Sequence, residues 1–149
     1  MTALITADLV DLDVPSTDRE TAVAALAKRL VDAGRITDLD RFLADIEARE
    51  AQMPTGLEGG IGIPHCRSEA VTEPSLAFGR SSTGVYFGAE DGPANLIFMI
   101  AAPVEGDSDH MTVLASLARR LVRRSFTDEL RNATDPAAVA EFIQGEVAG

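Results

Sequence analysis

The sequence has little of what several classes of protein require. It holds one cysteine in 149 residues, which excludes an internal disulfide and suits a reducing compartment. It has no excess of positive charge, because its formal net charge is -11. General nucleic-acid binding and docking on anionic lipid both need a basic surface, so neither is expected. An acidic surface remains compatible with a basic protein partner through electrostatic steering.

The sequence also lacks a long hydrophobic run. The longest apolar stretch covers residues 96–102, which is far too short to cross a bilayer, and the first residues do not resemble a signal peptide. We therefore expect a soluble cytoplasmic protein with no direct membrane insertion. The composition is 46% hydrophobic and 25% charged, with no repeat or linker, which predicts a single globular domain over residues 1–149.

Two helices are expected in the first third of the chain. The stretch Thr17-Asp18-Arg19-Glu20 reads as a capping box, and apolar residues at helical spacing predict a helix over about 17–33 that ends at Gly34. A second helix is expected to start near Asp38, because the next apolar residues fit the i, i+3, i+4, i+7 stripe: Leu39, Phe42, Leu43 and Ile46.

Extended segments are expected at 61–65, 75–80, 84–88 and 94–102. The last of these is continuously apolar, which is typical of a central strand with both faces covered by helices. The pattern therefore predicts an α/β fold.

Three further helices are expected in the C-terminal part. The first follows a loop in which Asp107 or Ser108 can act as N-cap, and its apolar stripe is Leu114, Leu117, Ala118 and Leu121. A short helix is predicted over 125–132. The last helix begins at Asp135 and Pro136, a cap followed by proline at the first helical position.

The most informative stretch runs from Gly56 to Cys66 and contains four glycines, a proline and one of only two histidines. Pro64 fixes its own φ angle and biases Ile63 to an extended conformation, so His65 is presented from a stiffened position. Imidazole suits proton or phosphoryl exchange near neutral pH. The alternative is a structural histidine that is satisfied within the core.

Three other residues are candidates for the same site. His110 is expected in the first turn of its helix, where the helix dipole favours a neutral imidazole and a nearby anion. Arg49 falls on the apolar side of the second helix, so it either points into the site or snorkels at the helix end. Thr55 and the amides of the glycine loop can add neutral hydrogen-bond donors.

Metal binding and cysteine chemistry are competing interpretations. Neighbouring residues in an extended segment point to opposite faces, so His65 and Cys66 are poor joint ligands, and no CxxC or HxxxH spacing is present. We therefore expect no metal. A nucleophile built from Cys66 and His110 has no support in the local sequence.

At these residues the sequence resembles the fructose/mannitol class of enzyme IIA domains (EIIA type 2) of the bacterial phosphoenolpyruvate-dependent sugar phosphotransferase system (PTS). The resemblance covers nearly the whole chain. Its strongest part is Gly60-Ile61-Gly62-Ile63-Pro64-His65, preceded by Arg49-Glu50 and Thr55-Gly56. His110, followed by Leu114 and Leu117, resembles the second site histidine of that family. Cys66 departs from the small residue that usually follows the first histidine, which raises the question of local oxidation.

The resemblance implies a three-layer α/β/α fold, with a mixed sheet sandwiched between helices. It implies a phosphotransferase component in which Nε2 of His65 takes a phosphoryl group from HPr and passes it to a cysteine or histidine of an enzyme IIB, in work with a membrane enzyme IIC. His110 would stabilise the phosphoryl group, Arg49 and Thr55 would contact it, and no cofactor would be used. The alternative is a regulatory enzyme IIA of the nitrogen-related type, which acts mainly by binding other proteins.

Overall fold

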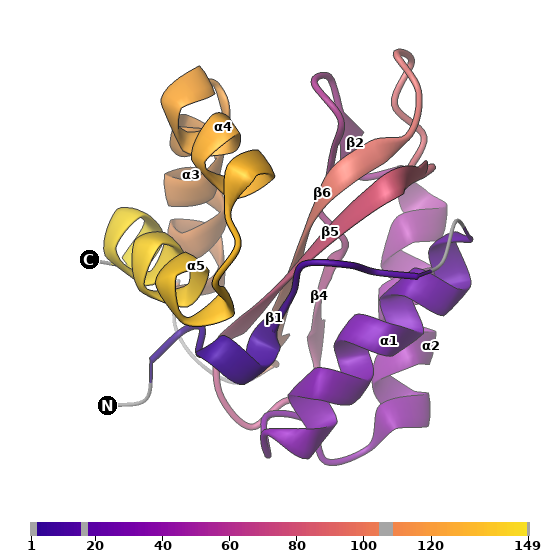
Figure 1. Ribbon diagram of the computed structural model, residues 1–149. Helices are drawn as coiled ribbons and strands as arrows, with labels where there is room; N and C mark the ends of the chain where they lie inside the picture. The colour runs from indigo at the N-terminus through magenta and orange to yellow at the C-terminus, as the bar shows by residue number, and fades with distance from the viewer. Residues whose placement is uncertain (1–2, 16–17, 105–108, 149) are drawn as a thin grey trace.

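The computed structural model describes residues 3–15, 18–104 and 109–148, and at 109–111 the backbone alone. It has three layers, as expected (Figure 1). The described residues form a six-stranded mixed sheet, with helices α1 and α2 on one face and helices α3, α4 and α5 on the other.

The first helical layer follows the sequence closely. Helix α1 (Arg19–Asp32) begins after Asp18, whose side chain accepts a hydrogen bond from the Thr21 amide. The cap is therefore Asp18, whereas the capping box predicted Thr17, which lies outside the described residues. Helix α2 (Leu39–Gln52) has the expected cap, because the Asp38 side chain accepts from the Arg41 amide.

The sheet is built around its longest strands. Strands β5 (Ser75–Val85) and β6 (Ala94–Pro103) form an antiparallel pair. β6 is buried along nearly its whole length, so the prediction of a central strand is confirmed. The separate strand predicted at 84–88 is wrong, because β5 continues past an irregularity in register and ends at Val85.

Short strands complete both sides of this pair. They are β1 (Val10–Asp11), β2 (Gly56–Leu57), β3 (Ile61–Gly62) and β4 (His65–Ser68). β1 follows a short 3₁₀ turn (Ala7–Leu9) and runs parallel to β5. β3 and β4 both run parallel to β6, one after the other along the same side, and β2 forms a hairpin with β3.

The C-terminal layer consists of α3 (Asp109–Leu121), α4 (Arg124–Asn132), α5 (Pro136–Ile143) and a π-helical end (Gln144–Ala148). Asp135 caps α5 with Pro136 in its first turn, as predicted. Leu117 of α3 is fully buried, but Ala118 is exposed, so the predicted stripe is wrong at that position. The caps predicted at Asp107 and Ser108 lie outside the described residues.

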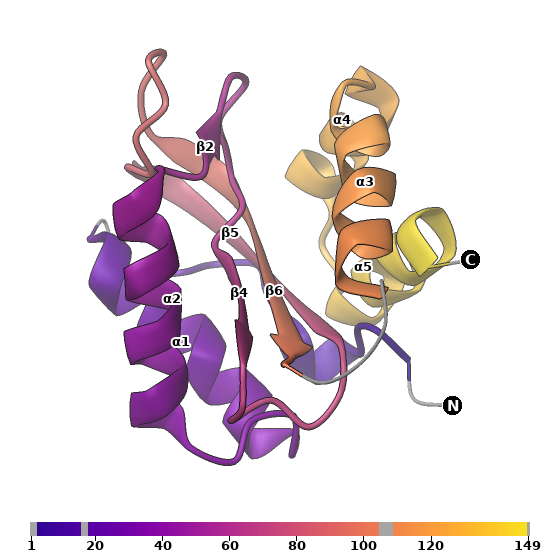
Figure 2. The ribbon, with the colours of Figure 1, turned by 180° about the vertical axis from the view of Figure 1, so that it is seen from behind.

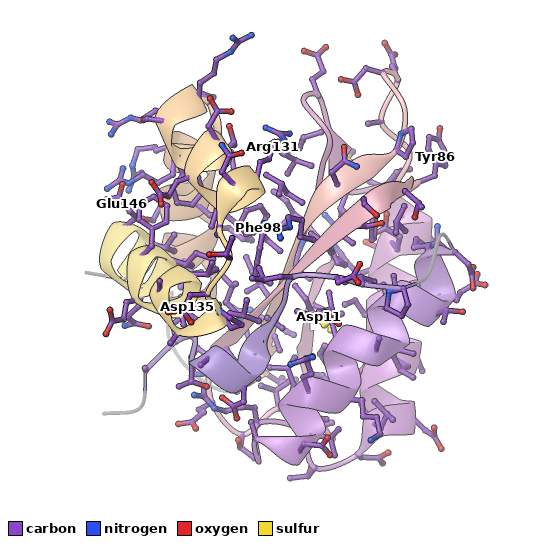
Figure 3. All side chains as sticks on the ribbon, in the orientation of Figure 1. Asp11, Tyr86, Phe98, Arg131, Asp135 and Glu146 are labelled. Atoms are coloured by element: carbon purple, nitrogen blue, oxygen red, sulfur yellow. The ribbon has the colours of Figure 1, made fainter. Side chains whose placement is uncertain are left out.

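Aromatic rings join this layer to the sheet. Phe98 of β6 lies 5.1 Å from Phe78 and 6.3 Å from Phe126, measured between ring centroids, and Phe126 stacks on Phe142 at 5.3 Å. Figure 3 shows Phe98 between the sheet and the C-terminal helices. Such contacts add to the free energy of burial, and they fix the C-terminal helices on the face of the sheet opposite α1 and α2.

An arginine ties the same layers together through backbone oxygens. Arg80 of β5 donates from Nη1 to the carbonyls of Leu130, Arg131 and Ala133 at 2.7–3.1 Å, at the end of α4. Carbonyls at a helix C-terminus lack partners within the helix and carry partial negative charge, so a guanidinium stabilises them.

Candidate functional site

His65 begins a strand at the edge of the sheet. The extended segment predicted at 61–65 is in fact two short strands, β3 and β4, separated by Ile63 and Pro64. Pro64 has no amide to donate, but its carbonyl accepts from the Ile100 amide at 3.0 Å, so the line of pairing with β6 continues through the break. His65 then pairs in register with Ile100.

The ring of His65 is held by its own loop. Nδ1 lies 2.7 Å from the carbonyl oxygen of Ile63. A carbonyl oxygen can only accept, so Nδ1 carries the proton in this contact, and the lone pair of the neutral ring is on Nε2. The side chain is half-buried. If the ring acts as a nucleophile, this geometry makes Nε2 the attacking nitrogen.

The two faces of β4 lie in different surroundings. Side chains alternate along a strand, and Cys66 and Ser68 are buried whereas Arg67 is exposed. The Ser68 hydroxyl donates to Asp45 of α2 at 2.6 Å, so this buried face lies against α2. His65 and Arg67 consequently lie on the other face, the side on which α3 is found (Figure 2).

Arg67 is a site candidate that the sequence reasoning missed. It shares its face of β4 with His65 and makes no ion pair within the described part of the chain. The spacing of two residues from His65 in an extended segment was the signal that would have found it.

Cys66 is unsuited to nucleophilic chemistry. Burial, together with the nearby negative charge of Asp45, raises the pKa of the thiol to about 12. The thiolate is the reactive form, so Cys66 is essentially unreactive near neutral pH. The competing interpretation of a nucleophile formed with His110 therefore gains no support from the structure.

Thr55 is bound to a buried carboxylate. The Thr55 amide donates to Oε2 of Glu50 at 2.8 Å, and its hydroxyl donates to Oε1 at 2.7 Å. Both residues are buried. Contact of Thr55 with a phosphoryl group remains a prediction, and it requires one of these bonds to exchange. Glu50 belongs to the sequence motif Arg49-Glu50, but its contact with Thr55 was not predicted.

The glycine loop is a closed structural turn. The amide of Gly59 donates to Asp91 Oδ2, that of Gly56 to the Phe87 carbonyl, and that of Ile63 to the Thr55 carbonyl, at 2.9–3.1 Å. These three amides are occupied in this arrangement, and contact of the loop amides with a phosphoryl group stays a prediction.

The glycines of the loop are needed for conformation and space. Gly59 and Gly60 have φ of +91° and +78°, which L side chains rarely adopt. A Cβ on Gly62 would lie 2.6 Å from the ring of Phe87. The loop is also bound to the C-terminal layer, because Arg131 of α4 donates to the Gly59 carbonyl. Figure 3 shows this side chain reaching from α4 toward the strands.

The remaining two candidates come from helix ends. Arg49, half-buried in the last turn of α2, donates from Nη1 to the carbonyl of the C-cap residue Met53 at 3.3 Å. Its contact with a phosphoryl group stays a prediction. His110 is the second residue of α3, in the first turn as expected, and its side chain lies outside the described residues.

The described ranges hold neither a metal-binding cluster nor a membrane-spanning helix. Among those residues, no three His, Cys, Asp or Glu side chains come together in a group able to hold a metal ion. None of the described helices has the length and apolar character needed to cross a membrane.

Comparison with known sequences gives a consistent match. Residues 3–146 match the family model described as "Phosphoenolpyruvate-dependent sugar phosphotransferase system, EIIA 2". The chain is 38% identical over 137 residues to the "PTS system fructose-specific EIIA component" of Haloferax volcanii, which covers 91% of this chain and 89% of that protein.

Solved structures with the same fold include two enzyme IIA proteins. The nitrogen regulatory protein IIA-Ntr from Neisseria meningitidis superposes with a TM-score of 0.85 at 26% identity, covering 94% of this chain and 96% of that one. The mannitol enzyme IIA from Escherichia coli, solved in complex with phosphorylated enzyme IIB, superposes with a TM-score of 0.79 at 26% identity, covering 95% and 97%.

Proposed function

Since the chain belongs to the EIIA 2 family of the phosphoenolpyruvate-dependent sugar phosphotransferase system, we propose that it carries a phosphoryl group on Nε2 of His65. HPr is the donor, and an enzyme IIB that works with a membrane enzyme IIC is the acceptor. The observation that supports this most directly is the 2.7 Å contact between Nδ1 of His65 and the Ile63 carbonyl. In the neutral ring this contact leaves a lone pair on Nε2, which a nucleophile needs.

The transfer step follows from this tautomer. The Nε2 lone pair attacks phosphorus, and an Nε2–P bond forms as the bond from phosphorus to the donor breaks. The electron pair of that bond returns to the donor. The ring of His65 becomes positively charged while Nδ1 keeps its proton, and the Ile63 carbonyl stabilises this charge because it accepts from Nδ1. For delivery to enzyme IIB, a nucleophile of that protein attacks phosphorus, the Nε2–P bond breaks, and its electron pair returns to Nε2 of His65.

Two arginines are candidates for binding the phosphoryl group. Arg67 lies on the same face of β4 as His65, and Arg49 lies in the last turn of α2. A guanidinium suits phosphoryl oxygens because its planar fork can donate two parallel hydrogen bonds. In this proposal His110, at the positive N-terminal end of α3, stabilises the phosphoryl group without bonding to phosphorus.

The acceptor is an enzyme IIB of a sugar transporter. The support is the 38% identity to a relative named as fructose-specific, compared with 26% identity to the nitrogen regulatory protein. A regulatory role is the second candidate, favoured by the TM-score of 0.85 to that regulatory protein. Both roles use the same chemistry at His65 and differ in the partner that receives or recognises it.

The direct experiment is phosphorylation with purified components. We expect one phosphoryl group per chain after incubation with phosphoenolpyruvate, enzyme I and HPr, seen by intact mass, with ³¹P NMR assigning it to Nε2. His65→Ala should take up none and keep its circular dichroism spectrum. Phosphorylation of His65→Ala to the wild-type level would disprove the proposed site.

A second measurement separates the two roles. Phosphorylated protein is mixed with candidate fructose-type enzyme IIB domains, and loss of its label is followed in time. Rapid transfer to one of them supports transport. Stable label with all of them, together with binding to a regulatory target that depends on phosphorylation, favours the regulatory role.

A further inference from the structure

A chain of four hydrogen bonds connects a buried carboxylate to the ring of His65. The carboxylate of Glu50 accepts from the amide and the hydroxyl of Thr55, at 2.8 and 2.7 Å. The carbonyl of Thr55 accepts from the Ile63 amide at 3.1 Å. The carbonyl of the same residue, Ile63, accepts from Nδ1 of His65 at 2.7 Å. Each contact therefore fixes the group that makes the next one.

Glu50 occupies an unfavourable place for an acidic residue. Only 6% of its surface is exposed, and burial of a carboxylate is costly unless hydrogen bonds replace its water. It also lies in the last turn of α2, where the helix dipole disfavours negative charge. Both of its oxygens bind one residue, Thr55, beyond the helix end. The stability of α2 itself therefore does not explain why a carboxylate is buried at this position.

We propose that Glu50 is a positioning residue for His65, acting through Thr55 and Ile63. Two charge-assisted bonds to one residue fix both its backbone and its side chain. The Thr55 carbonyl then sets the orientation of the Ile63 peptide, and this orientation aims the Ile63 carbonyl at Nδ1. Glu50 thereby maintains the tautomer in which Nε2 holds the lone pair.

The inference rests on the proposed function only for its effect on rate. The tautomer is a property of the unphosphorylated protein and can be measured without any partner. The ¹⁵N chemical shifts of the His65 ring distinguish a protonated nitrogen from one with a lone pair, and at about pH 8 an ordinary imidazole is neutral. Two independent readouts are therefore available: the tautomer population, and the rate of phosphorylation by HPr.

Four variants test the path. Glu50→Ala removes both bonds to Thr55. Glu50→Gln keeps the shape, because its amide oxygen can accept from the Thr55 backbone while its NH₂ donates to the Thr55 hydroxyl. Thr55→Val removes only the hydrogen bond from the Thr55 hydroxyl to Glu50. It serves as a second test of the path if Glu50→Ala is too unstable to study. Glu47→Ala is the matched control, because Glu47 is on the same helix and binds Arg19 instead.

We expect Glu50→Ala to shift the His65 ring toward a mixture of tautomers and to slow phosphorylation by about tenfold, since misplaced reacting groups carry costs of this order or more. Thr55→Val should shift both readouts in the same direction by less. Glu50→Gln should restore both to within about twofold of wild type, and Glu47→Ala should leave both unchanged.

An unchanged tautomer population in both Glu50→Ala and Thr55→Val would overturn the inference, and so would an equal slowing by Glu47→Ala. Failure of the proposed function looks different. In that case the wild-type protein takes no phosphoryl group from HPr, and the ¹⁵N shifts still report whether Glu50 sets the tautomer.

Discussion

The buried thiol of Cys66, next to His65, should make the stability of the protein depend on pH. Burial first, and then the charge of Asp45, raise the pKa of Cys66 from 9.0 to about 12. When folding raises the pKa of a group, its contribution to stability is complete at pH values below its pKa in the unfolded protein. This contribution is lost as the pH rises toward its pKa in the folded protein. For Cys66 the window is pH 9 to 12. Between neutral pH and about pH 10.5 the loss is about 2 kcal/mol in the free energy of unfolding.

The assay compares wild type with Cys66→Ala in urea unfolding at several pH values. Cys66→Ala is expected to be less stable at neutral pH, because it leaves a small cavity beneath α2. Its stability should nevertheless fall less steeply above pH 9, so that the difference between the two proteins narrows by about 2 kcal/mol at about pH 10.5. Other titrating groups are shared by both proteins and cancel in the comparison.

Alkylation provides a second readout of the same property. At about pH 8 the thiolate fraction should be about a thousandfold lower in the folded protein than in urea, and iodoacetamide should label the folded protein more slowly by at least that factor. Parallel loss of stability in wild type and Cys66→Ala, or labelling of the folded protein at the rate seen in urea, would refute the reasoning. If the reasoning holds, mild thiol oxidants leave phosphoryl transfer at His65 unaffected.

Two further predictions concern the groups around the phosphoryl site. His110→Ala should still accept a phosphoryl group but pass it to enzyme IIB about a hundredfold more slowly, because it loses a donor that stabilises the transferring group; an unchanged transfer rate in a quenched-flow assay would show that His110 has no such role. Arg49→Lys and Arg49→Met should both slow transfer, since neither retains the planar guanidinium, while thermal stability changes by no more than about 1–2 kcal/mol. Wild-type transfer by Arg49→Met would reduce Arg49 to a packing residue that caps the Met53 carbonyl.

Local chemistry explains why some elements were predictable from the sequence. Asp38 and Asp135 cap their helices through contacts with residues two or three positions away, so a short window of sequence contains both partners. The unbroken apolar run of β6 predicts a strand buried on both faces, because each of its side chains must leave water whichever way it points. Neither inference needed knowledge of the rest of the fold.

The candidate site was predictable in part. The glycines, Pro64 and His65 lie in one short stretch, and their order indicates a stiffened, accessible imidazole. The use of the loop amides was not predictable, because their acceptors Phe87 and Asp91 come from the connection between β5 and β6, some thirty residues away. A short stretch of sequence shows that a backbone amide is present, but not which distant oxygen accepts its hydrogen bond.

By itself, the sequence determined the caps of α2 and α5, whose partners are close along the chain, the core strand β6 through its unbroken apolar run, and a histidine held by proline and glycine. Tertiary structure alone decided how far β5 extends, which face of β4 His65 occupies, and which groups surround its ring. The path from Glu50 to the ring exists only once the chain has turned from α2 into β2 and β3 has paired with β2. The physical reason is that a hydrogen bond depends on distances of about 3 Å between groups, and packing of the whole chain sets those distances.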